Sequence, residues 1–132
     1  MPASAKPGPT YLLDTSAILA YLLKEAEGSR VHAVAERAAI PFISIAELYA
    51  MLWNRFDRAK ADEVVATLKE WQRPCLWPTE GVLLLAGKFR ALHRLSLADG
   101  LIAALAVVHG VTLVTKDPDF RVLRPDLKLL EL

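Results

Sequence analysis

Two aspartates, Asp99 and Asp117, place the strongest constraint on the fold of this chain. They lie in the stretch from Ser96 to Phe120, in which an apolar run, LIAALAVV, is followed by Gly110 and then by a β-branched run, VTLVT. This pattern predicts a buried helix, a tight turn and a buried strand. Asp99 then lies in the first turn of the helix, and Asp117 lies just past the carboxyl end of the strand. Ligands of α/β sheets bind beyond the carboxyl ends of the strands, so further acids at that edge would indicate a site.

Two more acids follow predicted strands. Asp14 follows a short buried strand at 10–13, and either of the next two hydroxyl residues can cap the helix that comes after it. Glu47 lies in the first turn of a helix that we expect to follow a minimal strand at 41–44. All four acids are therefore expected at one end of the same sheet.

The order of the predicted elements favours an α/β fold with a central, mostly parallel sheet flanked by helices. Strands alternate with helices, and connections of this length join parallel strands. The other predicted elements are helices at about 29–39, 58–71 and 79–94, and strands at about 74–77 and 127–130. We expect a single domain at 10–132, preceded by a flexible arm at 1–9 that contains three prolines and a glycine.

Composition narrows the functional classes. The net charge of +1 neither favours nor excludes nucleic acid, so a basic surface would have to be local. The longest apolar runs have about eight residues, far fewer than the roughly 20 that span a bilayer, and MPASAKPGPT lacks the apolar region of a signal peptide. One cysteine, Cys75, excludes a disulfide framework and fits the reducing cytoplasm, and the three histidines lack zinc-site spacing.

Four carboxylates at one edge need a counter-charge. The only basic neighbour in sequence is Lys116, and strand alternation predicts that its side chain points away from Asp117. Carboxylates within about 4–6 Å of each other take up a proton or bind a metal. Oxygen ligands select Mg²⁺ or Mn²⁺, and such an ion activates water for phosphodiester hydrolysis.

Each acid also has a purely structural interpretation. Ser44-x-x-Glu47 and Ser96-x-x-Asp99 both fit capping boxes, Asp117 before a proline fits a turn, and Asp14 before Thr15 fits an ordinary helix start. The convergence of four independent positions on one edge favours a site over four separate caps and turns.

The residues also resemble a known family. Its four signatures are similar to Leu12-Leu13-Asp14-Thr15-Ser16, to Ser44-x-x-Glu47, to the run from Leu97 to Ala104, and to the run from Thr115 to Phe120. The combination resembles PIN domains, and most closely the VapC toxins of toxin–antitoxin pairs, over about residues 10–125.

The resemblance implies a PIN-like three-layer fold and a Mg²⁺- or Mn²⁺-dependent endoribonuclease. It implies catalytic and metal-binding roles for Asp14, Glu47, Asp99 and Asp117, with Asp119 as a possible substitute for Asp117. It also implies supporting roles for the hydroxyls of Thr15, Ser16 and Thr115. The alternative hypothesis is a catalytically inactive PIN-like interaction module.

Partners are expected on basic and apolar surfaces. An RNA substrate needs cations around the acidic pocket, and the candidates are Arg55, Arg58, Arg94 and Lys116. The helix that begins at Ser44 is apolar on almost every side, which predicts a protein interface that includes some of Tyr49, Trp53 and Phe56. The resemblance implies both a homodimer and a VapB-like antitoxin.

Overall fold

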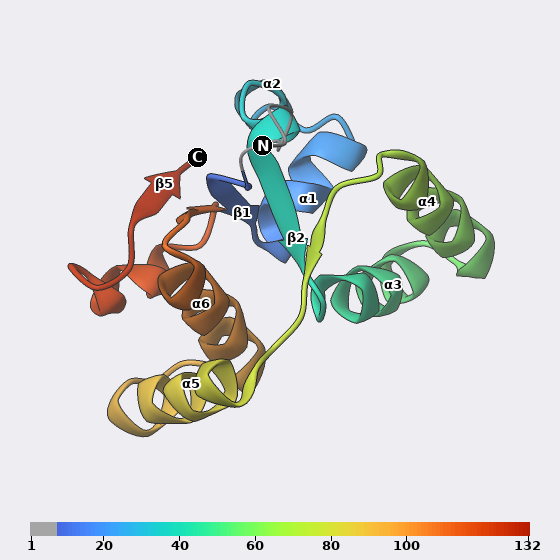
Figure 1. The fold of residues 1–132 in the computed structure, drawn as a ribbon. Coiled ribbons are helices and arrows are strands. Elements are labelled where there is room, and N and C mark those ends of the chain that lie inside the picture. Colours follow the sequence, from blue (N-terminus) through green and yellow to red (C-terminus); the bar gives the residue numbers. More distant parts are fainter. Residues whose placement is uncertain (1–7) are drawn as a thin grey trace, which may run out of the picture.

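A parallel sheet of five strands forms the centre of the described part of the chain (Figure 1). The computed structural model describes residues 8–132, so residues 1–7 of the expected arm lie outside the described residues. The strand order is β3-β2-β1-β4-β5. The strands are β1 (Tyr11–Leu13), β2 (Ala38–Pro41), β3 (Cys75–Leu76), β4 (Thr112–Thr115) and β5 (Leu129–Glu131).

Helices cover both faces of the sheet, which confirms the predicted three-layer α/β fold. They are α1 (Thr15–Leu22), α2 (Gly28–His32), α3 (Ser44–Arg55), α4 (Arg58–Glu70), α5 (Glu80–Leu92) and α6 (Leu97–His109), with 3₁₀ turns η1 (Ala35–Arg37) and η2 (Pro118–Leu123). Neighbouring strand residues point to opposite faces. Leu12 therefore packs in a core with α5 and α6, whereas Leu13 packs with α1, α3 and α4.

Side-chain caps define several helix ends where the sequence predicts them. Asp57 caps α4, Thr79 caps α5 and Ser96 caps α6, each by accepting a backbone N–H bond. Gly110 ends α6 in the left-handed conformation, with φ of 66°. Within residues 8–132, no helix has the length and apolar character needed to cross a membrane.

The prediction for residues 29–44 is wrong in its boundaries. The predicted long helix ends at His32, and β2 begins at Ala38 and has Pro41 as its last residue. This strand is fully buried between β1 and β3, and the Ile40 N–H donates to the Pro74 carbonyl at 2.9 Å. Pairing on both sides thus overrides the helical propensity of the alanines.

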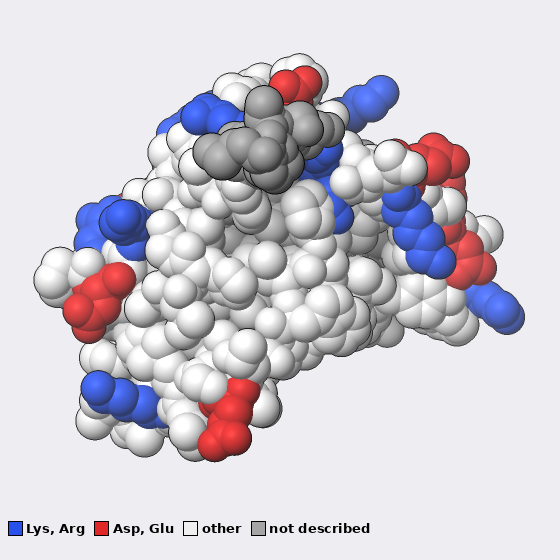
Figure 2. Space-filling view, in the orientation of Figure 1, with Lys and Arg blue, Asp and Glu red and all other residues white. Residues whose placement is uncertain are grey.

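Exposed apolar side chains gather on α3 and α5. On and just after α3 they are Ile45, Met51, Trp53 and Phe56, which are 36%, 47%, 45% and 48% exposed. Leu83, Leu84 and Leu92 are exposed on α5. Figure 2 shows the face that spans α3 and α5 as a broad uncharged surface with the charged groups near its edges. An uncharged face of this kind is suited to contact with another chain.

Candidate active site

The four predicted acids lie around one pocket at the carboxyl ends of the central strands. Asp14 follows β1, Glu47 lies in the first turn of α3 after β2, and Asp117 lies just beyond β4. Asp99 enters from the first turn of α6. All four line a pocket of about 360 Å³. The strand order reverses between β1 and β4, so the pocket lies where ligands of α/β sheets bind.

Asp14 is held by three hydrogen bonds. Its Oδ1 accepts from the Ser16 hydroxyl at 2.6 Å and from the Ala17 N–H at 2.9 Å, and its Oδ2 accepts from the Thr115 hydroxyl. Asp14 is therefore itself the N-cap of α1, a role that the sequence had suggested for Thr15 or Ser16. Burial raises the pKa of this carboxyl, the three hydrogen bonds oppose that rise, and the charge of Asp117 adds to it.

Glu47 is oriented by a chain of hydroxyl groups. The Thr15 hydroxyl donates to Glu47 Oε1 at 2.6 Å and lies 3.0 Å from the Ser44 hydroxyl. Because Thr15 has one proton and gives it to Glu47, Ser44 must donate to Thr15. The predicted Ser44–Glu47 capping box is wrong, since the N-cap of α3 is Ile43 and makes no side-chain cap bond.

A second set of hydrogen bonds fixes the backbone after β4. The Thr115 hydroxyl accepts from the Asp117 N–H at 2.9 Å, and the Ser16 hydroxyl accepts from the Lys116 N–H at 3.0 Å. Asp117 Oδ1 accepts from the Asp119 N–H at 2.9 Å and so caps η2. Asp117 lines the pocket, whereas Asp119 is exposed and does not.

The pKa of Asp99 reflects both burial and the negative charge of the pocket. Burial and then the charge of Asp117 raise the pKa of Asp99 from its usual 3.8 to about 6. The charges of Glu47 and Asp14 add to the rise, and a hydrogen bond with Ser96 opposes it. The other three carboxylates thus add to the effect of burial in opposing the ionisation of Asp99.

The donor set fits a hydrated hard cation. Five carboxylates line the pocket, those of the four predicted acids and of Glu25, and Mg²⁺ binds through one or two carboxylates while it keeps several waters. Within residues 8–132, no group of three acidic, histidine or cysteine side chains is arranged so that it could hold a metal ion by itself. An open pocket of this volume leaves room for the waters and for a substrate phosphate.

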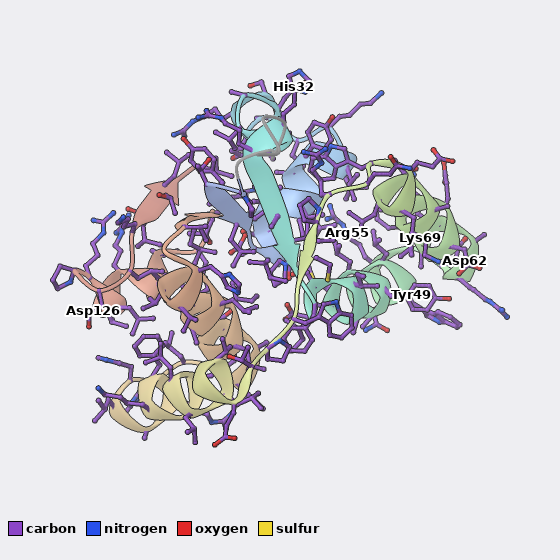
Figure 3. All side chains as sticks on the ribbon, in the orientation of Figure 1. His32, Tyr49, Arg55, Asp62, Lys69 and Asp126 are labelled. Carbon is purple, nitrogen blue, oxygen red and sulfur yellow. The ribbon has the colours of Figure 1, made fainter. Side chains whose placement is uncertain are left out.

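Two of the four predicted RNA-binding cations line the pocket. They are Arg55 at the end of α3 (Figure 3) and Lys116. Lys116 lines the pocket together with Asp117, but its ammonium group pairs with Glu25 and Glu27 rather than with Asp117. Arg58 and Arg94 are exposed and do not line the pocket.

Sequence reasoning missed two polar groups at this site. Ser44 is fully buried and donates its hydroxyl proton toward Thr15, although its position in an S-x-x-E pattern indicated a cap. Glu25 lines the pocket from the turn between α1 and α2, and no local pattern marks it. At the pocket it pairs with Lys116, a residue that is distant in sequence.

Comparisons with known proteins identify the same fold. The sequence profile of the PIN domain matches residues 11–124. Similar solved structures include DNA-bound VapBC from Salmonella typhimurium, with a TM-score of 0.77, 19% identity, and coverage of 93% of this chain and 98% of that chain. VapBC-1 from nontypeable Haemophilus influenzae gives a TM-score of 0.71, 24% identity, and coverage of 92% and 96%.

A third similar structure is VapC20 from Mycobacterium tuberculosis, a Sarcin-Ricin loop cleaving toxin. It gives a TM-score of 0.68, 16% identity, and coverage of 86% of this chain and 95% of that chain. At these identities the structures share the fold with this chain. A comparison with curated proteins returned no match.

Proposed function

Because this chain belongs to the PIN domain family, we propose that it is a metal-dependent endoribonuclease that hydrolyses RNA phosphodiester bonds as the toxin of a toxin–antitoxin pair. The observation that carries the proposal is the pocket lined by carboxylates from four separate elements. If each acid served only as a helix cap or a turn residue, nothing would require the four carboxylates to line the same pocket.

The residues divide into ligands and supports. Asp14, Glu47, Asp99 and Asp117 are the groups that would hold Mg²⁺ or Mn²⁺. When bound, such an ion polarises a phosphoryl oxygen and makes water a stronger nucleophile. The hydroxyls of the supporting residues hold two of the carboxylates in fixed orientations, Thr15 on Glu47, and Ser16 and Thr115 on Asp14.

The partners follow from the relatives and from the surface. Similar structures are VapBC complexes, which supports a VapB-like antitoxin for this chain. A relative described as cleaving the Sarcin-Ricin loop supports an RNA substrate. In this proposal residues 10–132 act as one PIN-like domain in the cytoplasm, where the RNA lies, and two copies associate through the apolar surface of α3.

The proposal is tested with purified, antitoxin-free protein. RNA cleavage should require Mg²⁺ or Mn²⁺ and should stop when EDTA is added. Glu47→Gln keeps an acceptor for the Thr15 hydroxyl but removes a charge, so cleavage should fall by about 100-fold or more (one oriented catalytic group is worth about that much) while stability holds. Glu63→Gln, on the exposed surface of α4, is the matched control and should remain active.

Two results would contradict the proposal. One is full activity in EDTA, and the other is an absence of cleavage with every single-stranded and structured RNA tried. The second result would favour an inactive PIN-like interaction module, for which the exposed apolar side chains of α3 are the supporting observation.

A further inference from the structure

Lys116 lies at the rim of the acidic pocket but is paired with acids outside the set of four. Its Nζ is 3.4 Å from Glu25 Oε1 and 3.4 Å from Glu27 Oε2. Both glutamates lie in the turn between α1 and α2, far from Lys116 in sequence. Glu25 and Lys116 line the pocket, whereas Glu27 does not. One ammonium group is thus shared between two carboxylates of a neighbouring turn.

The position of this ammonium group matters because it can compete with a metal ion. Lys116 directly precedes Asp117, and its N–H is bonded to Ser16, which in turn donates to Asp14. A lysine has a long flexible stem and a compact charge. From this anchored backbone, the free ammonium would be attracted to the four carboxylates and would neutralise the negative charge that a divalent cation needs.

The turn that carries the two glutamates is held firmly. The Glu25 N–H donates to the Ala20 carbonyl at 2.8 Å, and the Gly28 N–H donates to the Glu25 carbonyl at 2.9 Å. A Cβ at Gly28 would approach the Ala20 carbonyl oxygen to 2.6 Å, so the turn packs closely on α1. The two carboxylates are therefore presented at a defined position.

The ion pairs are also better protected than an ordinary surface pair. The side chains of Lys116, Glu25 and Glu27 are 34%, 30% and 34% exposed, compared with 72% and 54% for the Arg58–Asp62 pair on α4. Lower exposure reduces screening by water and salt. Two carboxylates on one ammonium hold it more strongly than a single exposed partner would.

We propose that Glu25 and Glu27 are positioning residues that hold the Lys116 ammonium at the rim and so keep the four carboxylates free for a divalent cation. This inference rests on the proposed function, since it assumes that the pocket binds such an ion. Loss of the two glutamates releases Lys116 into the pocket, where it competes with the metal.

A double-mutant cycle on Mn²⁺ affinity tests the inference without relying on cleavage. Isothermal titration calorimetry would compare the wild type, Glu25→Gln with Glu27→Gln, Lys116→Gln, and the variant with all three changes. We expect the paired glutamine variant to bind Mn²⁺ at least tenfold more weakly. Lys116→Gln should change the affinity by less than threefold in the wild type but restore it almost fully in the glutamine background.

Two further variants separate positioning from a general change of charge. Glu27→Gln alone leaves the charges that line the pocket unchanged. If this variant binds Mn²⁺ more weakly and the added change Lys116→Gln restores the affinity, the effect comes from the ammonium group. Glu131→Gln removes a carboxylate that is paired with Arg121 and Arg124 outside the pocket. This control should leave the Mn²⁺ affinity unchanged.

The outcomes distinguish the inference from the proposed function. If Lys116→Gln changes the affinity by the same factor in both backgrounds, the glutamates act through their own charge or as ligands, and the positioning role is wrong. If the wild type binds no Mn²⁺ at all, the proposed metal site fails, and the inference falls with it.

Discussion

Neutral hydroxyl groups orient the acids at this site. Thr15 donates to Glu47, and Ser16 and Thr115 donate to Asp14. A hydroxyl fixes the direction of a carboxylate and leaves its charge in place. A paired arginine would fix the direction and also neutralise the charge. The repulsion among the acids therefore remains, and it adds to the effect of burial in raising the pKa of Asp99.

The raised pKa of Asp99 predicts a pH dependence of stability in the metal-free protein. The pKa of about 6 in the folded state exceeds the usual 3.8, so the folded protein binds this proton more tightly than the unfolded chain. The contribution of Asp99 to stability is complete below about pH 4 and is lost as the pH rises to about 6. The shift corresponds to about 3 kcal/mol, which partial exposure reduces to roughly 1 kcal/mol.

Asp99→Asn should remove this loss. Between pH 4 and pH 7, the free energy of unfolding of the variant should rise by about 1 kcal/mol relative to that of the wild type. Urea denaturation in EDTA at several pH values measures the difference. Asp126→Asn, at an exposed position away from the pocket, is the control. Parallel curves for Asp99→Asn and the wild type would show that the pKa of Asp99 is not raised in the folded protein.

Local sequence locates the acids more reliably than it assigns their contacts. Asp14 and Asp117 could be placed because each follows a recognisable strand, and Asp99 because Ser96 marks a helix start. The contacts of Ser44 could not be predicted, because a hydroxyl at that position serves a cap and a tertiary bond equally well. The place of Glu25 at the pocket could not be predicted either, because its partner Lys116 is distant in sequence.

At the scale of elements, a strand with a strong pattern in its own sequence was predicted better than a strand whose conformation depends on pairing with its neighbours. VTLVT gives β4 within one residue, because β-branched residues between a glycine and an aspartate have few other interpretations. β2 consists of Ala38, Ala39, Ile40 and Pro41, and local propensity favours a helix over most of it. Its strand conformation depends on partners on both sides, β1 and β3.

Helix α3 combines a buried stripe with an exposed apolar one. Leu48 and Leu52 are almost fully buried, whereas Trp53 is 45% exposed and meets Tyr49 edge-on at 5.6 Å. The Tyr49 hydroxyl donates to Asp62 of α4 at 2.7 Å, so this aromatic pair is anchored to the neighbouring helix (Figure 3). An ordered and exposed aromatic pair is a suitable centre for an interface.

Trp53→Glu should separate the proposed homodimer without unfolding the chain. Because Trp53 is already half exposed, the free energy of unfolding should fall by less than about 1 kcal/mol, whereas a charge at the interface opposes association. Sedimentation velocity measures the shift toward monomer, and circular dichroism checks the fold. Val122→Glu, at an exposed position of η2 outside α3 and α5, is the control. A wild type that is monomeric, or a variant that unfolds, would contradict this role of α3.

For the whole molecule, the charge balance limits how the protein can attract RNA. The net charge is only +1, and the pocket is lined by acids. Two cations line the same pocket, and Lys116 is already paired with two glutamates. Within residues 8–132, Arg55 forms no ion pair, and the central carbon of its guanidinium lies 5.3 Å from the centroid of the Phe56 ring. Arg55 is therefore the main free cation for an RNA phosphate.

This balance predicts a shallow salt dependence of RNA binding. Each phosphate contact on a single strand contributes a slope of about −0.7 to log K against log salt, so one or two contacts give a slope between about −0.7 and −1.4. Arg55→Ala should reduce the slope by about 0.7, because it removes one contact, whereas Arg58→Ala, outside the pocket, should leave it unchanged. Fluorescence anisotropy with a short single-stranded RNA in EDTA measures binding without cleavage. If the slope is steep and Arg55→Ala does not change it, the RNA binds mainly to another basic surface. The pocket would then receive only the phosphate that is cut.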